Sequence, residues 1–207
     1  MAEQTPNIIL IAGPNGAGKS TAAKALLVDS LGVDEFVNAD TIARGLSAFR
    51  SDRVAIDAGR IMLKRLRELT AKRANVAFET TLASRSFAPW IADLRGQGYT
   101  FLLHYFWLPS SDFAVQRVAE RVARGGHFVP DKDVHRRYQA GLHNFFELYM
   151  PIADEWTIYD NSRPVENFRM IATGALSKTD FVLDSELWNN LRRNYANGTT
   201  DAKESGT

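Results

Sequence analysis

Short apolar runs alternate with longer amphipathic stretches along most of the chain. Ile8–Ile11 is a bare apolar run followed closely by a glycine, which is typical of a fully buried parallel strand. Val54–Lys72 instead repeats apolar residues at helical spacing. The same criteria predict further strands at 36–38, 75–78, 100–108 and 157–159, and further helices at 20–31, 87–97, 112–124 and 134–149. This alternation predicts an α/β fold with a central parallel sheet covered by helices on both faces.

The length of the chain indicates a single domain. Its 207 residues can bury one substantial core but are too few for two comfortable catalytic domains. We expect residues 1–195 to form this domain. Residues 196–207 are polar and rich in Gly, Ser and Thr, so they are expected to form a flexible tail.

Charge and cysteine content narrow the classes of function. Lys and Arg number 25 against 24 Asp and Glu, so the net charge of +1 gives no general attraction to nucleic acids or acidic membranes. A nucleic-acid end kinase is therefore disfavoured. The chain has no cysteine, which excludes disulfides and thiolate zinc sites and suits a cytoplasmic protein. No apolar run approaches the roughly 18 residues that a membrane span needs, so no membrane-spanning segment is predicted.

A glycine-rich segment between the first strand and the first helix carries the strongest functional signal. Residues 13–20 match the pattern G-x-x-x-x-G-K-[ST] in full, in the strand–loop–helix context that this phosphate-binding loop requires. Backbone N–H groups and the helix N-terminus would surround the phosphates of ATP, Lys19 would reach the terminal phosphates, and the Ser20 hydroxyl would bind Mg²⁺. The alternative is a glycine-rich β–α turn without a ligand. The residues expected to contact the nucleotide are Gly13, Pro14, Asn15, Gly16, Ala17, Gly18, Lys19, Ser20 and Thr21.

Two carboxylates follow other predicted strands. Asp40 comes just after the second strand, where it is either a general base that takes the proton of an acceptor hydroxyl or a cap for a helix beginning at Thr41. Glu79 ends the third strand and is followed by Thr80. This pair would recognise a substrate hydroxyl or assist Mg²⁺, unless Glu79 is a solvated strand end and the threonine caps the next helix.

Basic residues concentrate between about 117 and 137, around a double glycine. Such local basicity in a near-neutral chain predicts an anion partner, and two helices joined by a Gly-Gly turn predict a lid that closes over the triphosphate. The alternative is a solvated helix face with surface salt bridges. The basic residues of this segment are Arg117, Arg121, Arg124, Lys132, Arg136 and Arg137.

Two further segments have less specific interpretations. Tyr159–Ser162 ends the predicted strand at 157–159, and would form either the turn beside the adenine or an ordinary Asp/Asn/Ser turn. The aromatic residues of the strand at 100–108 are predicted to lie in the sheet core in preference to forming a stacking platform for nucleic acid.

Together these motifs resemble the zeta-toxin-like P-loop kinases over residues 8–162. The resemblance implies that Asp40 is the base, that Lys19 and Ser20 contact phosphate and metal, and that Glu79 is a substrate-site acid. Arg124 and Arg137 best match the two phosphate-facing arginines of that family, although Arg121 and Arg136 are close enough to replace either. The matching segments are the phosphate loop, Asn38-Ala39-Asp40, Phe78-Glu79-Thr80-Thr81-Leu82, Arg117-Val118, Arg121-Val122, Gly125-Gly126-His127, Arg136-Arg137-Tyr138 and Asp160-Asn161-Ser162.

The resemblance implies an ATP-dependent, three-layer P-loop kinase with a helical lid that phosphorylates a hydroxyl of a small molecule. In zeta toxins proper the acceptor is a UDP-activated amino sugar, and a small helical antitoxin silences the enzyme. This chain is shorter than the best-known zeta toxins, and its Gly-Gly-His lid is similar to that of compact chromosomal relatives. A different class of function, a nucleotide-dependent switch that hydrolyses ATP slowly and signals through a partner, is the alternative.

Overall fold

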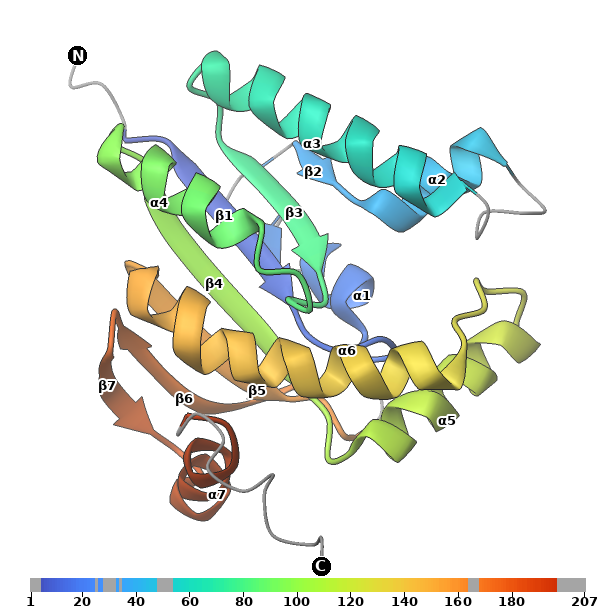
Figure 1. Ribbon diagram of the computed structural model, residues 1–207. Helices are drawn as coiled ribbons and strands as arrows, with labels where there is room; N and C mark the ends of the chain where they lie inside the picture. Colours follow the sequence, from blue (N-terminus) through green and yellow to red (C-terminus); the bar gives the residue numbers. More distant parts are fainter. Residues whose placement is uncertain are drawn as a thin grey trace, which may run out of the picture.

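The computed structural model describes residues 5–24, 26–27, 33, 35–47, 54–163 and 168–196 (Figure 1). Residues 197–207 of the tail predicted at 196–207 lie outside the described residues, as do positions 25 and 28–31 of the helix predicted at 20–31. The described strands are β1 (Asn7–Ala12), β2 (Phe36–Val37), β3 (Val76–Thr80), β4 (Thr100–Trp107), β5 (Glu155–Asp160), β6 (Arg169–Ala175) and β7 (Lys178–Val182). The described α helices are α1 (Lys19–Lys24), α2 (Ala39–Leu46), α3 (Ala55–Ala71), α4 (Phe87–Gly96), α5 (Ser111–Ala123), α6 (Asp131–Asn144) and α7 (Ser185–Tyr195).

These strands form one sheet in the order β2-β3-β1-β4-β5-β6-β7. The first five are parallel, and β6 and β7 are antiparallel at one edge. The predicted α/β class is therefore confirmed, with a sheet that is mostly parallel. Because β1 lies between β3 and β4, the loops that follow β1 and β3 meet at the same end of the sheet.

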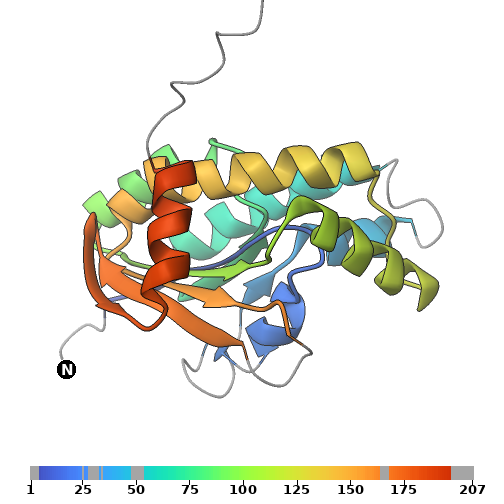
Figure 2. The same cartoon turned by 90° about the horizontal axis from the view of Figure 1, so that it is seen from below.

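Helices cover both faces of the sheet. Figure 2 shows α4 and α6 on one face and α1 on the other. The central strands between these layers are largely apolar, and residues 8–12 of β1 are fully buried. The aromatic side chains of β4 lie in this core as predicted, since Phe101, Tyr105 and Phe106 are fully buried. No described helix is long and apolar enough to cross a membrane.

Three described elements, β6, β7 and α7, lie beyond the last strand that the sequence predicts, at 157–159. Strand β6 is rich in small residues, which have low strand propensity. It forms a strand because it pairs with β5. The glycine at 174 lets the neighbouring groups approach closely, since a Cβ atom there would lie 2.6 Å from the ring of Trp156 and 2.1 Å from the Lys178 carbonyl oxygen. The ring of Trp188 on α7 stacks on Trp156 with a centroid separation of 5.3 Å, which attaches α7 to this edge.

The helix predicted at 134–149 differs from the observed one at both ends. It begins earlier, at Asp131, and the carboxylates of Asp131 and Asp133 in its first turn favour a helix start at this point. From Phe145 to Tyr149 the backbone changes to a π-helix. Such π turns are frequent at functional sites. Here Tyr149 donates a 2.6 Å hydrogen bond to the Ser84 carbonyl oxygen, which holds the loop after β3.

The half-buried imidazole of His104 on β4 makes the free energy of unfolding depend on pH. Its Nδ1 atom is 3.3 Å from the Tyr159 hydroxyl, and its Nε2 atom is buried without a partner among the described residues. Burial lowers the pKa of His104 from 6.5 to about 4, so at pH values between these the unfolded chain binds a proton that the folded chain does not. The free energy of unfolding should therefore fall, by on the order of 2 kcal/mol, between about pH 7.5 and about pH 5.

Urea denaturation at these two pH values checks this expectation. His104→Gln is the control, because it removes the titrating group and should remove this part of the pH dependence. Equal losses of stability in the wild-type protein and the variant would contradict the prediction.

Candidate active site

The loop from Gly13 to Ser20 joins β1 to α1 as the sequence predicts. Gly13, Gly16 and Gly18 all have positive φ angles, of 139°, 80° and 71°. A Cβ atom on Gly13 would lie 2.3 Å from the carbonyl oxygen of Phe106 on β4. Only glycine fits this position, because the backbone of the loop passes directly against the neighbouring strand.

The Lys19 side chain is buried at the start of α1 and is only 6% exposed. Its Nζ atom donates a 2.9 Å hydrogen bond to the Pro14 carbonyl oxygen and lies 3.6 Å from Glu79 Oε1. Burial lowers the pKa of Lys19 from its ordinary value, while the nearby carboxylates of Glu79 and Asp40 act in the opposite direction. The ammonium group is therefore held inside the phosphate loop, close to two carboxylates.

Glu79 connects the phosphate loop to the second strand. Its Oε2 atom accepts hydrogen bonds from Ser20 Oγ at 2.6 Å and from Asn38 Nδ2 at 2.7 Å. Glu79 reaches the phosphate loop because β3 lies beside β1 in the sheet. It pairs in register with Ile11 on β1, two residues before the loop begins at Gly13. The side chain is 12% exposed, so its interpretation as a solvated strand end is wrong.

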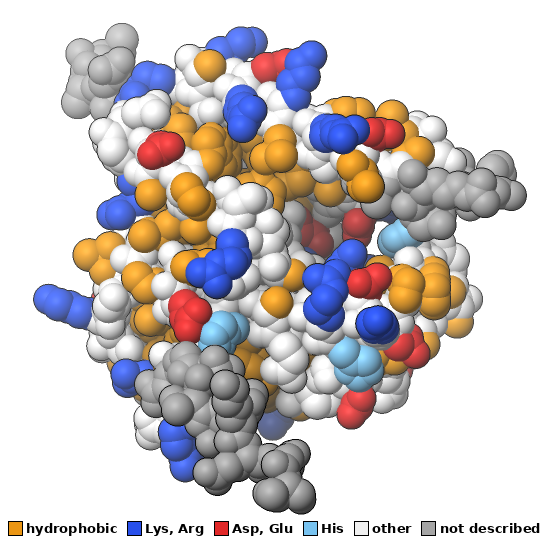
Figure 3. All heavy atoms as spheres, viewed as in Figure 1, with side chains coloured by type: hydrophobic (Ala, Val, Ile, Leu, Met, Phe, Trp, Pro, Cys, Tyr) orange, Lys and Arg blue, Asp and Glu red, His pale blue; other side chains and the backbone are white. Residues whose placement is uncertain are grey.

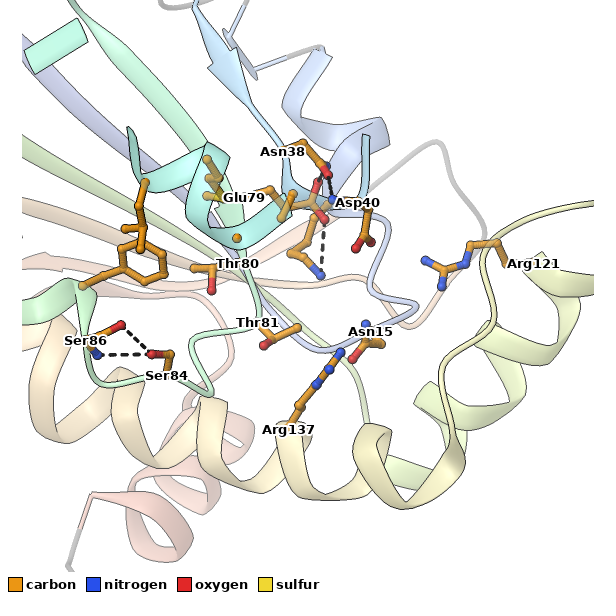
Figure 4. Close-up of a pocket in the computed structure, with 16 residues that line it drawn as sticks. Asn15, Asn38, Asp40, Glu79, Thr80, Thr81, Ser84, Ser86, Arg121 and Arg137 are labelled. Atoms are coloured by element: carbon orange, nitrogen blue, oxygen red, sulfur yellow. Dashed lines mark hydrogen bonds and ion pairs between the residues drawn. The ribbon is translucent and has the colours of Figure 1, made fainter. Parts of the chain in front are cut away.

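Asn38, and not Asp40, caps helix α2. The Asn38 Oδ1 atom accepts hydrogen bonds from the backbone N–H of Asp40 at 2.8 Å and of Thr41 at 3.1 Å. The capping role considered for Asp40 is therefore wrong, and the helix begins at Ala39. The Asp40 carboxylate instead points into the cavity, towards the phosphate loop (Figure 4). Sequence reasoning missed Asn38, although an asparagine before a helix is a capping signal.

The lid arginines separate into two groups. Arg121 on α5 and Arg137 on α6 line the same cavity as Lys19, and Figure 4 shows both facing it. Arg124 is exposed at the C-cap of α5, and Arg136 is paired with Asp133 at 2.9 Å. The structure thus brings Arg121 and Arg137 to the cavity and leaves Arg124 and Arg136 outside it. The resemblance instead favoured Arg124 together with Arg137 as the phosphate-facing pair.

Arg121 is held in place by the turn that follows its own helix. Its Nη2 atom donates a 2.7 Å hydrogen bond to the His127 carbonyl oxygen in the turn after α5. Its Nε atom is buried and has no hydrogen-bond partner among the described residues. A buried N–H donor without a partner costs free energy, so this position favours an anionic ligand that accepts from it.

Arg117 has a different role from its helix neighbours. Its Nη2 atom donates to the carbonyl oxygens of Ser162 at 3.0 Å and Arg163 at 3.3 Å. Asn161 in the same turn donates a 2.7 Å hydrogen bond to the Ala17 carbonyl oxygen. These contacts attach the turn after β5 to the phosphate loop, so the segment at 159–162 is more than a surface turn.

The cavity between these groups has a volume of about 330 Å³. Figure 3 shows it as a hollow with acidic side chains inside and Lys and Arg side chains at its edge. Asn15 and Lys19 line it from the phosphate loop, and Thr80 lines it from β3. Thr21 lies outside the lining, exposed on α1. The charged residues of the lining are Lys19, Asp40, Glu79, Arg121 and Arg137.

The described residues contain no cluster of three or more His, Cys, Asp or Glu side chains that could enclose a metal ion. The hydroxyl of Ser20 and the carboxylate of Glu79 are hard oxygen donors only 2.6 Å apart. This donor set fits Mg²⁺, which is usually bound through one or two protein oxygens together with substrate phosphates and water.

A family model described as an AAA domain, AAA_33, matches residues 8–144, about two thirds of the chain. The chain belongs to this AAA domain family. The match covers the phosphate loop, both carboxylates and the arginine-bearing helices α5 and α6, so all the charged residues of the cavity lie inside the AAA domain. An uncharacterized protein from Haemophilus influenzae is 26% identical over 130 residues, which are 63% of this chain and 91% of its own length.

Solved structures share the fold of this AAA domain at low identity. The crystal structure of AvrRxo1-ORF1:-ORF2 with ATP has a chain with a TM-score of 0.71 and 16% identity, covering 95% of this chain and 66% of that chain. A chain of the PezAT chromosomal toxin–antitoxin system of Streptococcus pneumoniae has a TM-score of 0.62 and 14% identity, and the match covers 97% of this chain and 82% of that chain. A gluconokinase from Sinorhizobium meliloti has a TM-score of 0.51 and 18% identity, and the match covers 77% of this chain and 85% of that chain. The chain therefore spans slightly less than two thirds of the matched AvrRxo1 chain.

Proposed function

We propose that this protein is an ATP-dependent kinase that transfers the γ-phosphoryl group of ATP to a hydroxyl of a small molecule. One observation carries the proposal: a single cavity joins the phosphate-loop Lys19 to the Asp40 carboxylate and to two arginines from a separate helical segment. Phosphoryl transfer needs these three kinds of group, for phosphate binding, for the acceptor proton and for the charge of the transferred group.

The phosphate end of the cavity suits a triphosphate. Backbone N–H groups of residues 13–20 would surround the phosphates, and Lys19 would exchange its bond to Pro14 for a phosphate oxygen. The buried Nε–H of Arg121 would gain the acceptor that it lacks. Ser20 and Glu79 are the residues that would hold Mg²⁺, which when bound neutralises phosphate charge.

Asp40 is the proposed base. It would accept the proton of the acceptor hydroxyl while that oxygen bonds to the γ-phosphorus and the bond to the ADP oxygen breaks. Arg121 and Arg137 would stabilise the negative charge on the transferred group. Asn38 supports this arrangement as a positioning residue, because its side chain holds the start of α2 and Glu79 at the same time.

Candidates for the phosphoryl acceptor and for a protein partner come from the resemblance to zeta toxins alone. A UDP-activated amino sugar is one candidate acceptor, and a small helical antitoxin is one candidate partner. The PezAT structure is that of a toxin–antitoxin system, and the AvrRxo1 structures contain ORF1 together with ORF2. These structural similarities support a search for a partner protein. Co-purification from the native organism would be the first experiment.

ADP release tests the proposed function. We expect the purified protein with Mg-ATP to release ADP slowly, and a metabolite extract to accelerate the release at least about ten-fold, because phosphoryl transfer needs an acceptor. A coupled assay measures the rate, and mass spectrometry with labelled ATP identifies the phosphorylated product. ATP binding without acceleration by any extract would contradict the kinase and favour the nucleotide-dependent switch.

A further inference from the structure

The cavity extends beyond the charged centre towards the loop that follows β3. Ser84 and Ser86 line this part of the cavity, and Figure 4 shows them on the side away from Asp40 and Arg121. Phe87, the first residue of α4, also lines it. We call this part the distal end of the cavity.

No described lining residue at the distal end carries a charge. The five charged lining residues come from the phosphate loop, the start of α2, the end of β3 and the two lid helices. Figure 4 shows the guanidinium of Arg137 directed towards Asn15, away from Ser84 and Ser86. Arg85 stands between the two serines in the chain, but it is exposed and does not line the cavity. A carboxylate or phosphate bound at the distal end would therefore lose part of its hydration without a cation among the described lining residues there to replace it, which is costly.

The distal end instead combines hydroxyl groups with an apolar wall. Ser84 and Ser86 are exposed, and their hydroxyl oxygens lie 2.7 Å apart, so each can donate to or accept from an alcohol group. Met62 and Leu63 of α3 also line the cavity, as does Phe87. A ring that bears hydroxyls at its edge and C–H groups on its face is complementary to such a surface.

The loop that forms the distal end is held rigidly by the helix that carries Arg137. Asn144 at the end of α6 donates a buried 2.7 Å hydrogen bond to the carbonyl oxygen of Leu82, whose φ angle of 57° is unusual for leucine. A Cβ atom on Gly141 would lie 2.3 Å from the Thr81 carbonyl oxygen, so the helix and the loop are in direct backbone contact. A loop fixed in this way is organised before a ligand binds.

We propose that Ser84, Ser86 and Phe87 form the acceptor subsite, and that it takes an uncharged, polyhydroxylated molecule of about monosaccharide size. A carboxylated, phosphorylated or nucleotide-linked acceptor does not match it, so the inference sets aside the UDP-activated amino sugar that the resemblance suggests. The cavity volume of about 330 Å³ supports a small acceptor, because it lies at the lower end of the roughly 300–1,000 Å³ of small-molecule sites and includes the phosphate end. This inference rests on the proposed kinase function.

Fractionation of a metabolite extract by charge tests the inference. The extract is passed at neutral pH over an anion exchanger and then over a cation exchanger, and each fraction is assayed for acceleration of ADP release. We expect the activity in the fraction that passes both columns. Retention on either column would overturn the inference and leave the kinase intact, whereas an inactive unfractionated extract would count against the kinase itself.

A double substitution tests the assigned residues. With the active fraction as acceptor, Ser84→Ala together with Ser86→Ala should raise the amount needed for half-maximal rate about ten-fold and leave the KM for ATP unchanged, because only acceptor hydrogen bonds are lost. Ser185→Ala, an exposed serine at the start of α7, is the matched control and should behave as wild type. Unchanged acceptor dependence, or an equal rise in both KM values, would overturn the assignment.

Discussion

Arg121→Ala is expected to lower kcat for phosphoryl transfer on the order of 10³-fold, whereas Arg124→Ala should remain within about three-fold of wild type. The two residues are three positions apart on one helical segment, and sequence patterns do not separate them. In the structure Arg121 lines the cavity with its buried Nε atom unpaired among the described residues, while Arg124 is exposed. Steady-state ADP release by the two variants measures the difference.

Thermal denaturation of both variants is the necessary control, because Arg121 also donates to the His127 carbonyl oxygen and its loss could loosen the lid. Arg121→Lys keeps the positive charge but not the planar donor group, so its kcat should lie between those of the alanine variant and wild type. If Arg124→Ala proves the more damaging substitution, the arrangement of the lid in the working enzyme differs from the one described above.

Asp40→Asn should lower kcat by about 10²–10⁴-fold while ATP binding stays within about two-fold of wild type. The amide has the shape of the carboxylate but cannot take the acceptor proton. The substitution should also preserve α2, because Asn38 caps this helix in place of Asp40. The coupled assay gives kcat, and calorimetry with Mg-ATP gives the dissociation constant.

Asp57→Asn is the matched control for this substitution. Asp57 also lies in the first turn of a helix, α3, but it is exposed and pairs with Arg60 at the surface, so its loss should not affect turnover. Full turnover by Asp40→Asn would refute the assignment of the base. An equal loss of activity in both variants would point to a general effect of charge at helix starts.

The elements that the sequence predicts correctly are those whose signals are local. The apolar run before Gly13 has to be a buried strand, and the glycines that follow it allow the positive φ angles of the loop. Helix α7, which the pattern analysis did not predict, also has a local signal: Asp184 is its N-cap, and buried Trp188 and Leu191 follow at helical spacing. Strand β6 has little signal of its own, because it depends on pairing with β5.

The phosphate loop, the alternation of strands and helices, and the presence of acidic and basic groups suited to phosphoryl transfer can all be predicted from the amino-acid sequence. Which of these groups meet depends on the packing of the strands and helices. The bonds of Glu79 to Ser20 and Asn38 span 59 and 41 residues, and they exist because β3 pairs with both β1 and β2. Helical periodicity likewise places arginines on a face, but the packing of α5 and α6 selects the ones that reach the cavity.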